Sequence, residues 1–112
     1  MGVPALRACH ARHVTAKSRG SGELDDFDAV FSALAHRARR TILSAMHSHG
    51  GEMTSGAIAA WFEHSWPTTS QHLRVLQQAG LVSVELRGRE HVYRLDSARL
   101  LAVTQGWLRY FG

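Results

Sequence analysis

The stretch that most constrains the fold of this chain is residues 65–81, SWPTTSQHLRVLQQAGL. Ser65 is a good N-cap whose hydroxyl can accept from the first free amides, and Pro67 falls in the first turn, where a missing backbone donor costs nothing. Ala79-Gly80 supplies a small last residue and then a glycine able to adopt the left-handed conformation that ends a helix. Between these signals a single buried face is expected from Thr69, Leu73 and Leu76.

The outer faces of this predicted helix carry one positive charge and no acid. Their residues are Trp66, Thr68, Ser70, Gln71, His72, Arg74, Gln77 and Gln78. An ordinary solvated helix face usually mixes acidic and basic side chains in pairs four residues apart. A surface that meets phosphates requires the absence of carboxylates instead. The composition of this face therefore favours a nucleic acid as partner.

Two short runs after this helix, residues 81–86 and 91–95, predict a β-hairpin. The first run alternates apolar with polar residues, which is the period of a half-buried strand, and the glycine-containing connection suits a hairpin. Arg87 and Arg89 lie in that connection and give the hairpin a basic tip. A helix followed by such a hairpin is the layout of a winged helix-turn-helix, in which the helix enters the DNA major groove and the wing touches the flanking backbone or minor groove.

Apolar residues at helical spacing predict four more helices. They cover residues 23–36, 39–47, 56–62 and 97–110. Acids concentrate in the first turn of the first of these helices, where they favour the helix dipole. Thr54 or Ser55 is expected to cap the third and Asp96 the last, while Glu52-Met53 can form a short strand that pairs with the wing. The predicted fold class is mainly α with a small β-hairpin (α+β).

Four blocks follow one another between residues 31 and 95: FSALAHRARRTIL, GGEMTSGAIAAWF, SWPTTSQHLRVLQQAGLV and LRGREHVYRL. In these residues and in their order, the chain resembles the ArsR-type family of bacterial winged-helix repressors. His36-Arg37-Ala38 stands where the family often has His-Pro or Asp-Pro. The resemblance implies a dimeric, sequence-specific DNA-binding regulator.

The last predicted helix carries a large apolar stripe close to the chain end. An exposed patch of that kind usually marks an interface, and the alternative is core packing within one subunit. The family packs its first and last helices across a twofold axis, so the resemblance implies that both helices join the subunit interface. The expected interface residues are Phe27, Val30, Phe31, Leu100, Val103, Trp107 and Phe111.

A chain of 112 residues has room for one domain, which we place at residues 23–112. Residues 1–22 hold four basic residues and no acid, without helical or strand periodicity, and we expect a flexible basic arm. Such an arm either adds phosphate contacts or has no function. No apolar run approaches the roughly 18 residues of a membrane span, so we expect a cytoplasmic protein without a membrane partner.

The sequence indicates neither a cofactor nor a metal site nor an enzyme. The single cysteine, Cys9, lies with His10 and His13 in the expected arm, where a ligand-like spacing has no preorganised geometry. Metal-sensing relatives carry Cys-x-Cys in the helix that matches residues 55–61, and others use Asp and His on the last helix, and both patterns are missing here. His47 and His49 together with His64 could hold zinc or nickel only if folding gathered them.

The leading hypothesis is a homodimeric repressor that places residues 66–74 of each subunit in major grooves about 34 to 36 Å apart on a palindromic operator. Gln71 would read bases because its amide can bond adenine in a bidentate way, and arginines would hold phosphates. The expected DNA-binding residues are Trp66, Thr68, Ser70, Gln71, His72, Arg74, Arg87 and Arg89. The alternative is a winged-helix module for protein interaction, which predicts little salt-dependent binding to duplex DNA.

Overall fold

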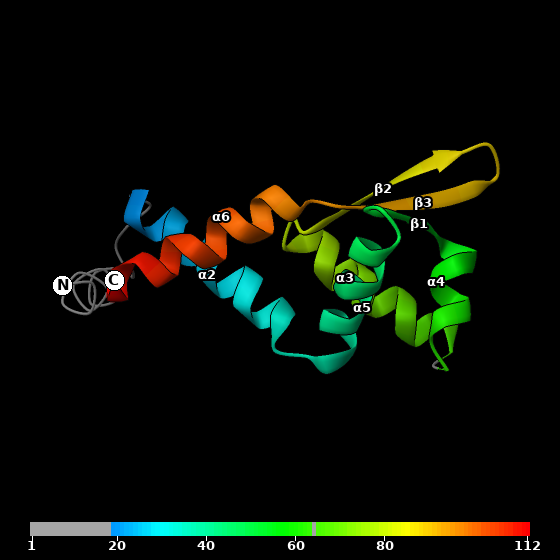
Figure 1. Cartoon of the computed structure of the whole chain (residues 1–112), viewed down its shortest axis with the longest axis horizontal. Helices are drawn as coiled ribbons and strands as arrows, with labels where there is room; N and C mark the ends of the chain where they lie inside the picture. The colour runs from blue at the N-terminus through cyan, green and yellow to red at the C-terminus, as the bar shows by residue number, and fades with distance from the viewer. Residues whose placement is uncertain (1–18, 64) are drawn as a thin grey trace.

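The chain forms a two-helix projection joined to a head of three helices and a sheet (Figure 1). The computed structural model describes residues 19–63 and 65–112, and the expectations for residues 1–18 and His64 lie outside these ranges. The elements are α2 (Arg19–Leu34), α3 (Arg37–Ser48), β1 (Glu52–Thr54), α4 (Ser55–Trp61), α5 (Trp66–Gln78), β2 (Val82–Arg87), β3 (Glu90–Leu95), α6 (Ser97–Leu108) and the short 3-10 helix η2 (Arg109–Phe111). The predicted fold class is confirmed.

The projection consists of α2, α6 and η2, which we call the stalk. The order of two ring pairs shows that its two long helices run antiparallel. The Phe27 and Tyr110 rings lie edge to face at 6.3 Å, and Phe31, further along the chain, pairs at 5.2 Å with Trp107, which precedes Tyr110. Asp96 caps α6 as predicted, since its Oδ1 accepts from the Arg99 amide at 2.9 Å. The stalk gives the molecule its long axis, and the overall extents are 47 × 29 × 24 Å.

The start of α2 differs from the prediction. The helix begins at Arg19, four residues before the predicted start. The acids between residues 23 and 28 therefore lie beyond its first turn, and the expected interaction with the helix dipole at that end is wrong. Glu23 instead accepts a hydrogen bond at 3.2 Å from the Tyr110 hydroxyl at the far end of the chain.

The break between α2 and α3 forms without a proline. His36 has an extended backbone and acts as the N-cap of α3, where its Nδ1 accepts from the Ala38 amide at 3.4 Å. The last carbonyls of α2 have no partner within the helix, and arginines of the next helix supply one: Arg40 Nη1 donates to Leu34 O at 2.8 Å. Cations are favourable at this end of a helix, which explains why several arginines follow the break.

The sheet is antiparallel with strand order β1-β3-β2, and the predicted short strand pairs with the wing as expected. The hairpin turn has two residues, Gly88-Arg89, and Gly88 has φ +64°, the pattern of a type II′ turn. Arg87 pairs with Glu90 inside the ladder, so the expected four-residue connection is wrong and the tip holds one arginine. Leu86 is 63% exposed because this end of the hairpin projects beyond the helices (Figure 1).

The core lies mostly in the head, between α3, α4, α5 and the sheet, and Val30 and Ala33 of α2 also belong to it. Its fully buried side chains include Ile42, Met46, Ile58, Leu73, Leu76 and Leu81. The buried face predicted for α5 is confirmed, and Thr69 on that face is 1% exposed. No helix within residues 19–63 and 65–112 is long and apolar enough to cross a membrane.

Candidate nucleic-acid interface

Helix α5 turns one polar face to solvent. Thr68, Gln71, Arg74 and Gln78 are exposed at spacings of three, three and four residues, opposite the buried face of the helix. Trp66 begins the helix and is 39% exposed. This face has no carboxylate along the whole of α5, so it can approach an anionic polymer without repulsion.

Ser65 occupies the N-cap position of α5, as predicted, but does not make the predicted bond. Its hydroxyl donates to Thr68 Oγ1 at 3.2 Å and makes no cap hydrogen bond to a backbone amide. The predicted cap bond is therefore wrong, and the Ser65 side chain bonds another side chain three residues on instead. The hydroxyls of Ser65 and Thr68 therefore form a small polar pair at the first turn of the helix.

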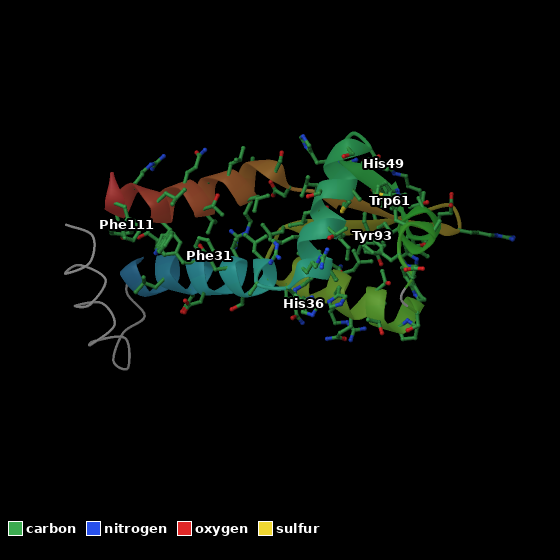
Figure 2. The ribbon with its side chains drawn as sticks, turned by 60° about the horizontal axis from the view of Figure 1, so that its bottom comes forward. Phe31, His36, His49, Trp61, Tyr93 and Phe111 are labelled. Carbon is green, nitrogen blue, oxygen red and sulfur yellow. The ribbon has the colours of Figure 1, made fainter. Side chains whose placement is uncertain are left out.

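Two other residues predicted to bind DNA, Ser70 and His72, are half-buried. The His72 ring lies 4.5 Å from the His36 ring, and its Nδ1 lies 3.4 Å from Arg39 Nη1. His36 sits where α2 gives way to α3, beside α5 (Figure 2). His72 thus faces the α2–α3 junction, which sequence spacing along α5 alone had not indicated.

The sheet carries a cluster of four charged side chains from its three strands: Glu52, Glu85, Arg87 and Arg94. Arg87 Nη2 lies 3.0 Å from Glu52 Oε2 and 2.6 Å from Glu85 Oε1, and Arg94 also bonds Glu52. The hydrogen bond from Arg87, followed by that from Arg94, holds the pKa of the Glu52 carboxyl below its ordinary value of 4.5, and the same carboxylates raise the pKa of Arg87. Arg89 is exposed in the turn at the hairpin tip.

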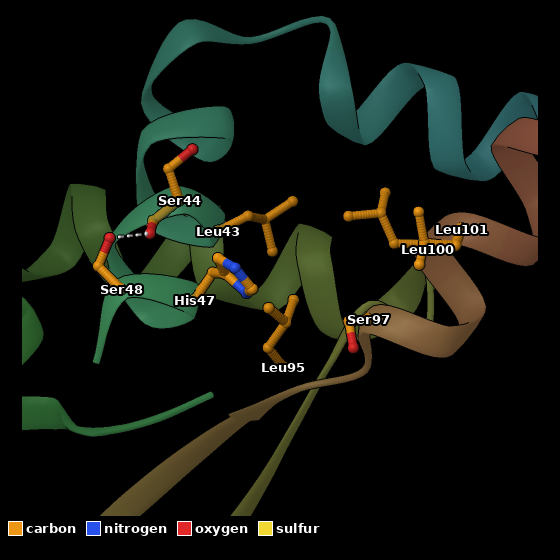
Figure 3. Close-up of a pocket in the computed structure, with 8 residues that line it drawn as sticks. All are labelled: Leu43, Ser44, His47, Ser48, Leu95, Ser97, Leu100 and Leu101. Atoms are coloured by element: carbon orange, nitrogen blue, oxygen red, sulfur yellow. Dashed lines mark hydrogen bonds between the residues drawn. The ribbon is translucent and has the colours of Figure 1, made fainter. Parts of the chain in front are cut away.

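A hollow of about 420 Å³ opens between α3, β3 and α6 (Figure 3). Leucines make up half of its lining, and no residue of α5 takes part. The lining residues are Leu43, Ser44, His47, Ser48, Leu95, Ser97, Leu100 and Leu101. The Ser48 hydroxyl donates to Ser44 O at 3.0 Å, so part of the polar rim is already engaged.

The pair His47 and His49 does not form a joint site. His47 lines the hollow, whereas His49 Nδ1 lies 2.8 Å from Ala45 O and its ring lies 5.6 Å from the Trp61 ring. Cys9, His10, His13 and His64 lie outside the described residues. In residues 19–63 and 65–112 no group of three histidine, cysteine, aspartate or glutamate side chains is placed to hold a metal.

The predicted interface residues differ in how much surface they offer. Val30 and Phe27 are 0% and 6% exposed and pack inside the subunit. Phe31, Leu100, Val103 and Trp107 are half-buried, and Phe111 is 60% exposed.

Two exposed leucines of α6 were missed by the sequence prediction. Leu101 and Leu108 are 54% and 55% exposed, on a stripe next to the predicted one. Their spacing of seven residues was the available signal. With Phe111 they give the stalk an exposed apolar surface in the isolated chain.

Residues 34–85 match a family model described as a helix-turn-helix domain. The transcriptional repressor SdpR of Bacillus subtilis strain 168 is 37% identical over 82 residues, which is 73% of this chain and 88% of SdpR.

Two solved structures share most of the fold. One is an ArsR-like transcriptional regulator from Rhodococcus sp. RHA1, with TM-score 0.69 and 29% identity, covering 79% of this chain and 81% of that one. The other is the homodimeric winged helix-turn-helix DNA-binding domain of Mb0332 from Mycobacterium bovis, a possible ArsR-family regulator solved in solution. Its TM-score is 0.67 with 32% identity, covering 85% of this chain and 89% of that one.

Proposed function

Because the chain belongs to the ArsR family of winged helix-turn-helix transcriptional regulators, we propose that it is a cytoplasmic homodimeric repressor that reads a palindromic operator. The observation that carries the proposal is the exposed face of α5, which is polar, free of carboxylates and held by a buried face on the core of the head. A rigid helix with such a face fits the DNA major groove.

Within this proposal the contacts divide into base reading and phosphate binding. Gln71 projects from the exposed face near the start of α5, where recognition helices contact base edges, and its amide matches the N6 and N7 groups of adenine. Arg74 lies one turn further on the same face and Arg89 lies at the wing tip, and both cations suit phosphates on either side of the groove. Thr68 adds a hydroxyl beside Gln71.

The second subunit would be held through the stalk. Leu101, Leu108 and Phe111 are each more than half exposed, and a monomer leaves this apolar surface in water. A twofold pairing of stalks buries it and leaves both heads free. Each α5 then meets its own half-site, and a symmetric operator follows from the symmetric protein.

The test is selection of bound sequences from a random duplex pool, followed by fluorescence anisotropy titrations on the selected duplex and on a scrambled one. We expect a selected site with inverted-repeat symmetry and an affinity at least about 10³-fold tighter than for scrambled DNA. Affinity should fall steeply as salt rises. Absence of salt-dependent duplex binding would refute the proposal and leave the protein-interaction module as the better reading.

A further inference from the structure

Arg99 of α6 joins the stalk to the C-terminal end of α5. Its Nε donates at 2.9 Å to the carbonyl oxygen of Ala79, the C-cap of α5, and its Nη2 lies 3.2 Å from Asp26 Oδ1 on α2. The Arg99 guanidinium therefore contacts both the end of α5 and α2. The approach is close: a Cβ added to Gly80 would lie 2.5 Å from Arg99 Nε.

Arg39 of α3 makes a second connection, nearer the middle of α5. Its Nε donates to Ala33 O at 2.8 Å and its Nη2 to Ser32 O at 3.3 Å, both at the end of α2. Its Nη1 lies 3.4 Å from His72 Nδ1 on α5. Like Arg99, it places one side of a planar guanidinium on α2 and the other on α5.

Two connections at separate points along α5 restrain its direction relative to α2. With a single connection, α5 could still rotate about that point. Guanidinium donors have fixed directions, so each connection tolerates little rotation. The stalk and the head also share apolar packing, since Val30 and Ala33 of α2 belong to the buried core (Figure 1). Apolar packing is non-directional, so it fixes the angle between the two parts less closely than the arginine hydrogen bonds do. If the stalk tilts by about 10° against the head, a lever of half the 47 Å length moves α5 by about 4 Å, which is roughly one base-pair step.

We propose that Arg39 and Arg99 are positioning residues that fix the angle between stalk and α5, and thereby set the spacing between the two half-sites that a dimer accepts. The inference rests on the proposed function, a dimer joined through its stalks. Neither arginine lies on the exposed face of α5, so neither needs to touch DNA to act in this way.

The experiment measures the affinity of the full chain for duplexes in which the selected half-sites are moved apart or together by one and two base pairs. Wild-type protein should prefer its best spacing by at least about tenfold over a one-base-pair change, because a rigid dimer that stays in register on one half-site loses base contacts on the other. Arg99→Ala and Arg39→Ala should reduce that ratio to about threefold or less. Arg94→Ala is the matched control: it removes the same charge from the sheet and should leave the ratio unchanged.

Two further variants separate positioning from a general loss of folding. Arg99→Lys keeps the charge and reaches one partner at a time, so we expect an intermediate ratio. Asp26→Ala leaves the contact of Arg99 with Ala79 and should lower the ratio less than Arg99→Ala. If Arg99→Ala does not fold, as judged by circular dichroism, these two variants decide the role of Arg99. Arg39→Lys, which keeps the charge and should give an intermediate ratio, decides the role of Arg39 if Arg39→Ala does not fold.

The outcomes separate the two proposals. A wild-type protein that binds its operator but shows no spacing preference overturns the positioning role and leaves the repressor proposal intact. The same holds if the folded Arg99 and Asp26 variants keep the wild-type ratio. Failure of the wild-type protein to bind any duplex instead rejects the proposed function itself.

Discussion

Arg87, at the end of β2, bonds Glu52 at the start of β1 across the intervening strand, with Nη2 and Oε2 3.0 Å apart. Glu85 lies against the same guanidinium. Arg87, the last residue before the hairpin turn, is therefore paired with two carboxylates of its own sheet. Arg89 lies beyond them, in the turn. The two arginines that look equivalent in the sequence have different electrostatic surroundings.

This difference predicts unequal effects on DNA binding. Arg89→Ala should weaken binding to every duplex and reduce the slope of log affinity against log salt by about one unit, because one phosphate contact is lost. Arg87→Ala should change the slope much less, since its charge is already neutralised within the wing. Salt titrations of both variants on one duplex make the comparison. Equal slopes would contradict the role given to the Glu52 cluster.

Replacing Gln71 tests base reading. We expect Gln71→Ala to cost about 1 to 3 kcal/mol on the selected operator and to relax the base preference at one position of each half-site, with little effect on scrambled DNA. Gln78→Ala removes the same amide from the far end of the exposed face and is the matched control. Parallel losses on operator and scrambled DNA would mean that Gln71 does not read sequence.

The Glu52 carboxylate predicts a pH-dependent contribution to stability. Because its pKa is depressed in the folded chain by Arg87 and Arg94, the stabilisation is present above the ordinary value of 4.5 and disappears as pH falls through the folded-state pKa. Glu52→Gln should lower Tm at pH 7, and its difference in Tm from the wild-type protein should shrink as pH falls below 4.5. Thermal unfolding over a series of pH values from 7 downward checks this. A Tm difference that persists in acid would point to packing instead.

Gly80 is predicted to be intolerant of a side chain. Its φ is +77°, and an added Cβ would collide with the Arg99 side chain. Gly80→Ala should lower the free energy of unfolding by at least about 1 to 2 kcal/mol from backbone strain alone. Gly56→Ala is the control, because that glycine lies in α4 with open space around it and should stabilise by up to about 1 kcal/mol. Denaturant unfolding measures both.

The exposed stalk leucines predict the effect of a charge on assembly. Leu108→Glu should weaken dimerisation by roughly tenfold or more, since burying a leucine contributes about 1.5 to 3 kcal/mol and a twofold interface contains it twice. Sedimentation velocity over a dilution series gives the dissociation constant. Leu86→Glu changes a comparably exposed leucine on the wing and should leave assembly unaltered.

The sequence predicted the elements that depend on local pattern. Spacing of apolar residues placed the buried face of α5 on Thr69, Leu73 and Leu76, and Asp96 was correctly expected to cap α6. Helix ends were displaced by up to four residues, as at the start of α2, because the apolar face of a helix says little about where its first turn begins.

The contacts that position the candidate site were not predictable in the same way. Arg99 and Asp26 are 73 residues apart, and Arg39 and His72 are 33 apart, so only the folded chain brings them together. His72 was expected on the DNA-facing side because it lies among polar residues, yet its neighbours His36 and Arg39, at the start of α3, draw it toward the junction. Long polar side chains reach several partners, and tertiary placement selects among them.

Helix α6 has no fully buried side chain in the single chain, although it carries three leucines and a tryptophan. If two stalks cover each other, part of the folding free energy is supplied by association and obeys mass action. Diluting the purified protein should then lower its melting temperature, and an operator that holds two subunits together should raise it again. The cellular amount of this regulator would thus govern how well it folds as well as how fully it occupies DNA.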